Sequence, residues 1–280
     1  MKIGFLCLPV TGHLNSMTAL ARKLQSRGHE VVFIGVPDTE RAIRAADLDF
    51  VSFCENEYPL GSIDKTWGAV ANLRGLEVVR YTTRELAPGL LRAALKHLPG
   101  KIAETAVTAL VLDSVFLFLE IVPVHLRLPY VRIWSVLHFD LSGATPLTFY
   151  GWPHETTPEA IARNRAGLAL IGELCEPTRR IAQAYADRNG LEIDWDNPTA
   201  TNCKLAAITQ TPREFDFPIP ELPPGFHYAG PLQDNDGREP IPFRWERLSG
   251  KPLIYASMGT LVNGLKSVYR AILEAVREFP

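Results

Sequence analysis

The opening of the chain alternates between two apolar runs and one amphipathic stretch. Residues 2–8 are almost continuously apolar, which is typical of a parallel strand that is covered on both faces. Thr11-Gly12-His13 follow, and the apolar residues between 14 and 24 recur at helical spacing until Gly28, a residue suited to ending a helix. A second apolar, β-branched run covers 30–36. The pattern predicts a βαβ unit with a right-handed crossover.

The same alternation continues to about residue 229. Thr157 before Pro158 is a typical helix start, Gly190 is a typical stop, and Pro177 is expected to kink or divide the helix between them. Strands alternating with helices predict an open, doubly wound α/β sheet. The further strands are expected at 50–53, 109–112, 130–134, 205–209 and 227–229, and the helices near 65–97, 116–125 and 158–188.

From residue 218 the chain becomes rich in Pro and Gly, with a charged stretch at 234–239, which is typical of a linker. Beyond it a new βα unit is predicted, with a strand at 253–257 and a helix at 267–279. One strand and one helix cannot bury a core of their own, so their apolar faces would favour self-association. The predicted organisation is a Rossmann-like domain at 1–230, a linker at 231–252 and the start of a second Rossmann-like domain at 253–280.

Composition and charge exclude several classes of function. The 280 residues carry 29 Lys and Arg against 31 Asp and Glu, so there is no basic excess for binding nucleic acid phosphates. The four cysteines are far apart and form no C-x-x-C pair, which indicates neither a metal site nor a disulfide framework. The most hydrophobic segment, 109–126, is interrupted by Asp113, Glu120 and Pro123. We therefore expect a cytoplasmic protein with no membrane span.

Three features are predicted to converge at the carboxyl ends of the strands: the turn Thr11-Gly12-His13, Asp113 and the loop after Trp134. A histidine beside a carboxylate can act as a general base, since the carboxylate fixes the tautomer and stabilises the imidazolium. The alternative is structural: His13 caps its helix and Asp113 bonds to turn amides. The spacing alone favours that structural interpretation.

A nucleotide-dependent oxidoreductase is a second alternative. Asp38 follows the second predicted strand, where dinucleotide-binding folds place the acid that binds ribose. However, the turn after the first strand contains one glycine, Gly12, in place of the three of G-x-G-x-x-G. The missing glycines argue against close approach to a pyrophosphate.

Several segments together resemble the nucleotide-sugar-dependent glycosyltransferases of the GT-B fold, a group that includes UDP-glucosyltransferases and bacterial macrolide and carotenoid glycosyltransferases. The resemblance implies the N-terminal half of a GT-B fold, and it covers the whole chain. The segments that carry it are Leu8-Pro9-Val10-Thr11-Gly12-His13-Leu14-Asn15, Ala19-Leu20-Ala21-Arg22-Lys23-Leu24, Arg27-Gly28-His29-Glu30-Val31, Leu110-Val111-Leu112-Asp113, Leu128-Pro129-Tyr130-Val131, Tyr228-Ala229-Gly230-Pro231-Leu232 and Leu253-Ile254-Tyr255-Ala256-Ser257-Met258-Gly259-Thr260.

The resemblance assigns roles to particular residues. It implies that His13 deprotonates an acceptor hydroxyl, that Asp113 orients His13, and that the oxygen displaces a nucleoside diphosphate with inversion. With it, catalysis becomes the favoured interpretation of this pair. It implies no metal and no cofactor, only a nucleotide sugar, UDP-glucose by preference, as co-substrate. The residues expected near the donor phosphates are Gly12, Ser257, Gly259 and Thr260.

Aromatic residues are dense beyond the predicted strand ends, which indicates an apolar cleft for a lipophilic, hydroxylated natural product. About half of these aromatics are expected to be ordinary core residues. His138 could help with proton transfer, but a structural histidine is the favoured interpretation. The residues predicted to bind the acceptor are Trp67, Phe116, Trp134, His138, Phe139, Phe149 and Trp152.

The chain departs from the family in lacking most of the donor domain. We therefore expect an inverting hexosyltransferase whose acceptor-binding and catalytic-base half is present, and which is poorly active as this chain alone. The alternative from another class is a non-catalytic binding module, or a truncated product that needs a partner to supply the donor domain.

Overall fold

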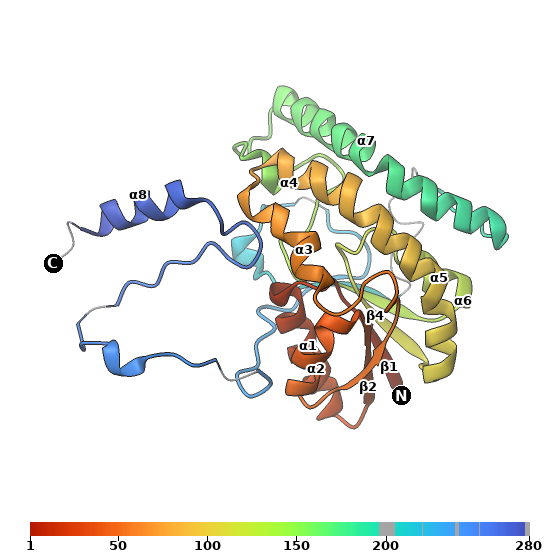
Figure 1. The fold of residues 1–280 in the computed structure, drawn as a ribbon. Helices are drawn as coiled ribbons and strands as arrows, with labels where there is room; N and C mark the ends of the chain where they lie inside the picture. The colour runs from red at the N-terminus through yellow and green to blue at the C-terminus, as the bar shows by residue number, and fades with distance from the viewer. Residues whose placement is uncertain (196–204, 220, 239–240, 252, 278–280) are drawn as a thin grey trace.

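The computed structural model describes residues 1–195, 205–219, 221–238, 241–251 and 253–277 (Figure 1). Within these residues the strands form one seven-stranded sheet in the order β3-β2-β1-β4-β5-β6-β7, and every neighbouring pair is parallel. The predicted doubly wound α/β sheet is confirmed. The strands are β1 (Lys2–Leu6), β2 (Glu30–Gly35), β3 (Asp49–Ser52), β4 (Ala109–Asp113), β5 (Tyr130–Trp134), β6 (Ala206–Thr209) and β7 (Phe226–Tyr228).

The order of the strands creates a switch point between β1 and β4. The chain runs outward from β1 through β2 to β3, returns to β4 on the other side of β1, and then continues to β7. Ile3 accordingly pairs with Val31 of β2 on one side and with Ala109 of β4 on the other. Helix α1 (Thr11–Gln25) makes the predicted crossover from β1 to β2. Ligands in such sheets bind beyond the carboxyl ends of the strands at this point.

Helices cover both faces of the sheet (Figure 1). Because side chains alternate along a strand, Phe5 and Leu6 belong to different cores. Phe5 packs in the core that includes α1 and α2 (Glu40–Ala45). Leu6 packs in the core that includes α5 (Ala87–Thr105), α6 (Ile121–Leu126) and α7 (Pro158–Arg188).

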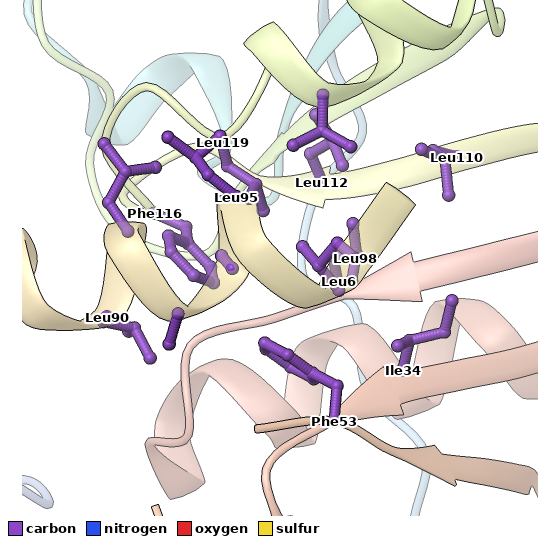
Figure 2. Packing of buried hydrophobic residues seen from close by; sticks show 14 of the residues in the cluster. Leu6, Ile34, Phe53, Leu90, Leu95, Leu98, Leu110, Leu112, Phe116 and Leu119 are labelled. Atoms are coloured by element: carbon purple, nitrogen blue, oxygen red, sulfur yellow. The ribbon is translucent and has the colours of Figure 1, made fainter. Parts of the chain in front are cut away.

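Figure 2 shows the second core from close by, with Leu6 and Ile34 of the sheet beside Leu98 of α5. These three side chains are at most 1% exposed. Full burial of one such side chain stabilises the fold by roughly 1.5–3 kcal/mol. The two cores hold the sheet rigid and so fix the positions of the residues at its carboxyl edge.

The helix predicted at 65–97 is broken into several pieces. α3 (Ser62–Gly68) and α4 (Leu76–Tyr81) are separate, and a π-helical turn, Thr82–Leu86, joins α4 to α5. Gly75, with a φ of +46°, stands between α3 and α4 in a conformation that other residues rarely adopt. The helix predicted at 116–125 is likewise confined to α6, because turns fill the segment before it.

Helix α7 begins and ends as predicted. The Thr157 hydroxyl accepts a hydrogen bond from the Ala160 amide at 3.2 Å, and Gly190 beyond the end has a φ of +63°. Pro177 does not divide the helix, which is continuous through it. The buried Thr178 hydroxyl donates to the carbonyl of Thr83 at 3.1 Å, so this part of α7 is tied to the π-helical turn.

The strand predicted at 253–257 is absent. Leu253, Ile254 and Tyr255 are exposed and belong to no regular element, and in the described chain no neighbouring strand pairs with them. A strand forms only where a partner satisfies its amides and carbonyls, which explains the difference. The predicted helix forms as α8 (Lys266–Val276), while residues 278–280 at its expected end lie outside the described part. Among the described helices, none combines the length and apolar character that crossing a membrane requires.

Candidate functional site

The switch point brings a histidine and an aspartate together from distant parts of the sequence. His13 is the third residue of α1, just beyond β1, and Asp113 is the last residue of β4. Because β1 and β4 are neighbours, with Leu6 paired to Leu112, the residues that follow them share one edge of the sheet. His13 Nδ1 lies 2.7 Å from Asp113 Oδ2, and the two side chains are 10% and 0% exposed. The predicted convergence of these two residues is confirmed.

Asp113 is held from several sides. Its Oδ2 also accepts hydrogen bonds from the Leu8 amide at 3.2 Å and from the Cys7 thiol at 3.6 Å, and its Oδ1 accepts one from the Val115 amide at 3.2 Å. Asp113 therefore bonds to turn amides, as the structural interpretation expects, and to His13 as well. The N-cap position of α1 is taken by Val10, which makes no side-chain capping hydrogen bond.

This arrangement fixes the orientation of the imidazole. When Asp113 is ionised it can only accept, so Nδ1 carries the proton and Nε2 is left as an acceptor. Burial above all, and then the charge of Asp113 and the hydrogen bond to it, raise the pKa of the Cys7 thiol well above its ordinary value. Cys7 therefore remains a protonated donor to the carboxylate.

His13 lies on the wall of a cavity of about 460 Å³. Of the seven residues predicted to bind an acceptor, Trp67, Phe116, Phe139 and Phe149 line this cavity. Most of the lining is apolar and comes from the segment after β4, the loop after β5 and the helices between β3 and β4. Lining residues that the sequence analysis did not identify are Leu8, Val78, Val79, Thr82, Thr83, Leu86, Ala87, Leu90, Val115, Leu117, Val136, Leu137, Thr148, Cys175 and Leu261. Apart from Leu8, these residues belong to no recognised motif, because their pattern is that of the apolar face of an ordinary helix or loop.

The other three predicted residues lie outside the lining. The Trp134 ring packs edge-on against Phe139 with centroids 5.1 Å apart. Trp152 stacks on Tyr150 at 4.0 Å and faces α7. His138 Nδ1 lies 2.8 Å from Asp216 Oδ2. These three residues therefore lie outside the cavity, behind or beside the aromatic residues that line it.

The residues predicted near donor phosphates gather at the start of α1. A Cβ on Gly12 would stand 3.5 Å from the Thr260 hydroxyl, so the turn at 257–260 lies close to that helix end. The Gly259 amide donates to the Ser257 hydroxyl at 3.2 Å, and Gly259 has a φ of +77°. Free amides at a helix N-terminus attract anions.

A second hollow of about 590 Å³ lies between the outer face of α1 and residues 231–234. His13 does not line it, and Arg22 of its wall is bound to Asp234 with an Nε–Oδ2 distance of 2.5 Å. His13 lies instead on the wall of the first cavity. Across the described ranges, no group of three or more His, Cys, Asp or Glu side chains is arranged to hold a metal ion.

No family model matches the chain. It is 26% identical over 272 residues to zeaxanthin glucosyltransferase of Pantoea ananas, covering 96% of this chain and 62% of that protein. It is 24% identical over 289 residues to demethyllactenocin mycarosyltransferase of Streptomyces fradiae, covering 99% and 57%. The chain thus spans about three fifths of the length of these relatives.

Solved structures agree on the fold. Spinosyn forosaminyltransferase SpnP matches with a TM-score of 0.56 at 19% identity, over 98% of this chain and 62% of that one. Glycosyltransferase VinC in complex with dTDP matches with a TM-score of 0.56 at 14% identity, over 90% and 58%. The chain is therefore a relative of the glycosyltransferases in sequence, and it has the Rossmann-like α/β fold of the GT-B glycosyltransferases over the part that it spans.

Proposed function

We propose that the whole protein is an inverting glycosyltransferase, which transfers a hexose from a nucleotide sugar to a hydroxyl of a lipophilic small molecule. The observation that carries the proposal is the buried His13–Asp113 pair on the wall of an apolar cavity. UDP-glucose is the first donor to test. The similarity to two proteins named as glycosyltransferases supports the class of reaction.

In this mechanism His13 is the general base. Asp113 holds the proton of Nδ1, so Nε2 takes the proton of the acceptor hydroxyl. The acceptor oxygen forms a bond to the anomeric carbon as the bond from that carbon to the diphosphate oxygen breaks, and the nucleoside diphosphate leaves with the electron pair. Attack from the face opposite the leaving group inverts the anomeric centre. The charge of Asp113 stabilises the imidazolium that forms.

The donor would lie at the start of α1. The amides of this helix end, where Gly12 has no side chain, and the nearby Thr260 hydroxyl offer neutral donors to a leaving diphosphate. A solved neighbour of the same fold is a complex with dTDP, which supports a nucleotide as the leaving group. Assays should therefore compare UDP-sugars with dTDP-sugars.

The acceptor would fill the cavity beside His13. Its volume of about 460 Å³ lies in the range of small-molecule sites, and its aromatic wall suits a flat, apolar compound. One relative is named for glucosylation of zeaxanthin, so hydroxylated polyenes are a suitable first class of acceptor.

The test is His13→Ala in the whole protein, assayed for glycosyl transfer with these donors and acceptors. General-base catalysis contributes about 10²–10⁴-fold, so kcat should fall by that factor while the protein stays folded. His227→Ala removes an exposed imidazole from β7 and serves as the matched control. A folded His13→Ala protein with an unchanged rate would refute the assignment. Acceptor binding without turnover of any donor would favour the binding module instead.

A further inference from the structure

A second buried histidine–aspartate pair lies away from the reaction centre. His138 belongs to the loop after β5, and Asp216 belongs to the loop after β6. Their Nδ1 and Oδ2 atoms are 2.8 Å apart, and the side chains are only 5% and 3% exposed. The Tyr228 hydroxyl, at the end of β7, donates to the same Oδ2 at 2.9 Å. The pair therefore ties the loop after β5 to the neighbouring strands.

Rings and charge hold this pair in place. The His138 ring lies 4.7 Å from the ring of Phe226 and 6.3 Å from that of Trp134. Burial, followed by the hydrogen bond to Asp216 and the charge of Asp216, raises the pKa of Tyr228 to about 12, so its hydroxyl remains a donor. Removing the His138 side chain from this buried contact leaves a cavity beside Asp216 and Phe226, which the surrounding loop fills by rearranging.

The residue next to His138 forms part of the cavity wall. Phe139 lines the cavity, and its ring packs edge-on against Trp134 at 5.1 Å and Phe149 at 5.6 Å. On the other side of Phe139, the Asp140 carboxylate accepts hydrogen bonds from the amides of Ser142 at 2.9 Å and Thr145 at 2.8 Å. Phe139 therefore stands between two anchored residues, which limits how far its ring can move.

We propose that His138 and Asp216 are a positioning pair, which sets Phe139 in the cavity wall and thereby determines which acceptors the cavity takes. His138 does not line the cavity, so it acts through Phe139. The nature of the ligand rests on the proposed function, whereas the positioning of the loop does not.

The experiment compares His138→Ala, Phe139→Ala and the double variant in the whole protein. All-trans-retinol, a flat lipophilic alcohol, is titrated by its own fluorescence, and amide hydrogen exchange is measured over residues 135–147. We expect His138→Ala to weaken retinol binding about five- to tenfold and to speed exchange at Ser142 and Thr145. In the Phe139→Ala background, the same change should weaken binding less than about twofold, because the two residues act as one unit.

Two further variants separate positioning from general stability. His138→Gln places a polar side chain beside Asp216 and fills part of the space of the ring, so it should restore retinol binding to within about twofold of the natural protein. His227→Ala, the exposed control, should change neither readout. If His138→Ala does not fold, Asp216→Asn, which keeps the side-chain shape, takes its place in both backgrounds.

Unchanged exchange in a folded variant would overturn the proposal, as would an equal loss of binding in the Phe139→Ala background. If the natural protein binds no retinol while exchange responds as expected, the positioning role stands. In that case the part of the proposed function that names a lipophilic acceptor is refuted. The two proposals can therefore fail separately.

Discussion

Replacing Asp113 by asparagine tests the proposed catalytic pair with the smallest change of shape. The carboxylate accepts from His13 Nδ1, the Leu8 amide and the Cys7 thiol on Oδ2, and from the Val115 amide on Oδ1. Asparagine has one oxygen and one NH₂ group. Whichever way the amide is turned, its NH₂ group faces at least one donor.

The magnitude follows from these contacts. A buried donor left without an acceptor costs about 1–3 kcal/mol of folding stability. The loss of catalysis should be larger, because the imidazolium loses a countercharge whose oxygen lies 2.7 Å from Nδ1. Unit charges about 4 Å apart at an effective dielectric constant of about 20 attract by about 4 kcal/mol. That energy corresponds to a fall in rate of about 10³-fold.

Initial rates of sugar transfer at saturating acceptor, together with thermal unfolding, measure both effects. Asp47→Asn is the matched control, because the Asp47 side chain is 90% exposed and its positive φ of 55° suits asparagine. The control should leave rate and stability close to those of the natural protein. A folded Asp113→Asn protein that retains more than about a tenth of the rate would refute the role given to this carboxylate.

Two further predictions concern titratable side chains. Iodoacetamide at about pH 8 should leave Cys7 and Cys54 unmodified in the folded protein. The reason is that burial, more than any other effect, raises the pKa of both thiols, and it raises the pKa of Cys54 to about 12. Peptide mass spectrometry measures the labelling of each cysteine. Labelling of the folded protein as fast as in urea would contradict this prediction. Hydrogen bonds from His97 and Lys96 lower the pKa of Glu57 to about 2 from an ordinary 4.5. The stabilisation of the fold by this carboxylate is thus complete above pH 4.5 and is lost toward pH 2. The urea midpoints of Glu57→Gln and of the natural protein should therefore differ near neutral pH and converge in acid. A difference that stays constant with pH would contradict this prediction.

The order of strands and helices could be predicted because the local pattern is strong. The apolar strand at 2–8, the helical spacing after it and the stop at Gly28 agree with one another, and the βαβ unit formed as expected. The start signal at Thr157 and Pro158 and the stop signal at Gly190 likewise predicted where α7 begins and ends. Local propensity and burial point to the same structure in these segments, so no distant contact overrides them.

Predictions were wrong where the outcome depended on distant contacts. The helix expected at 65–97 is broken near Gly75. The strand expected at 253–257 is absent because, in the described chain, it has no partner. Periodicity reports which face of a segment is apolar, and it does not report whether another element is available to cover that face.

The sequence by itself determined the doubly wound fold and the proximity of His13 and Asp113, because the end of a parallel strand has a predictable place at the edge of the sheet. Only the tertiary structure decided which aromatics form the cavity. Phe116, Phe139 and Phe149 line it, whereas His138 lies behind the wall with Asp216. The physical reason is that loops leaving neighbouring strands are placed by contacts with each other, and residues so far apart in sequence carry no local signal of those contacts.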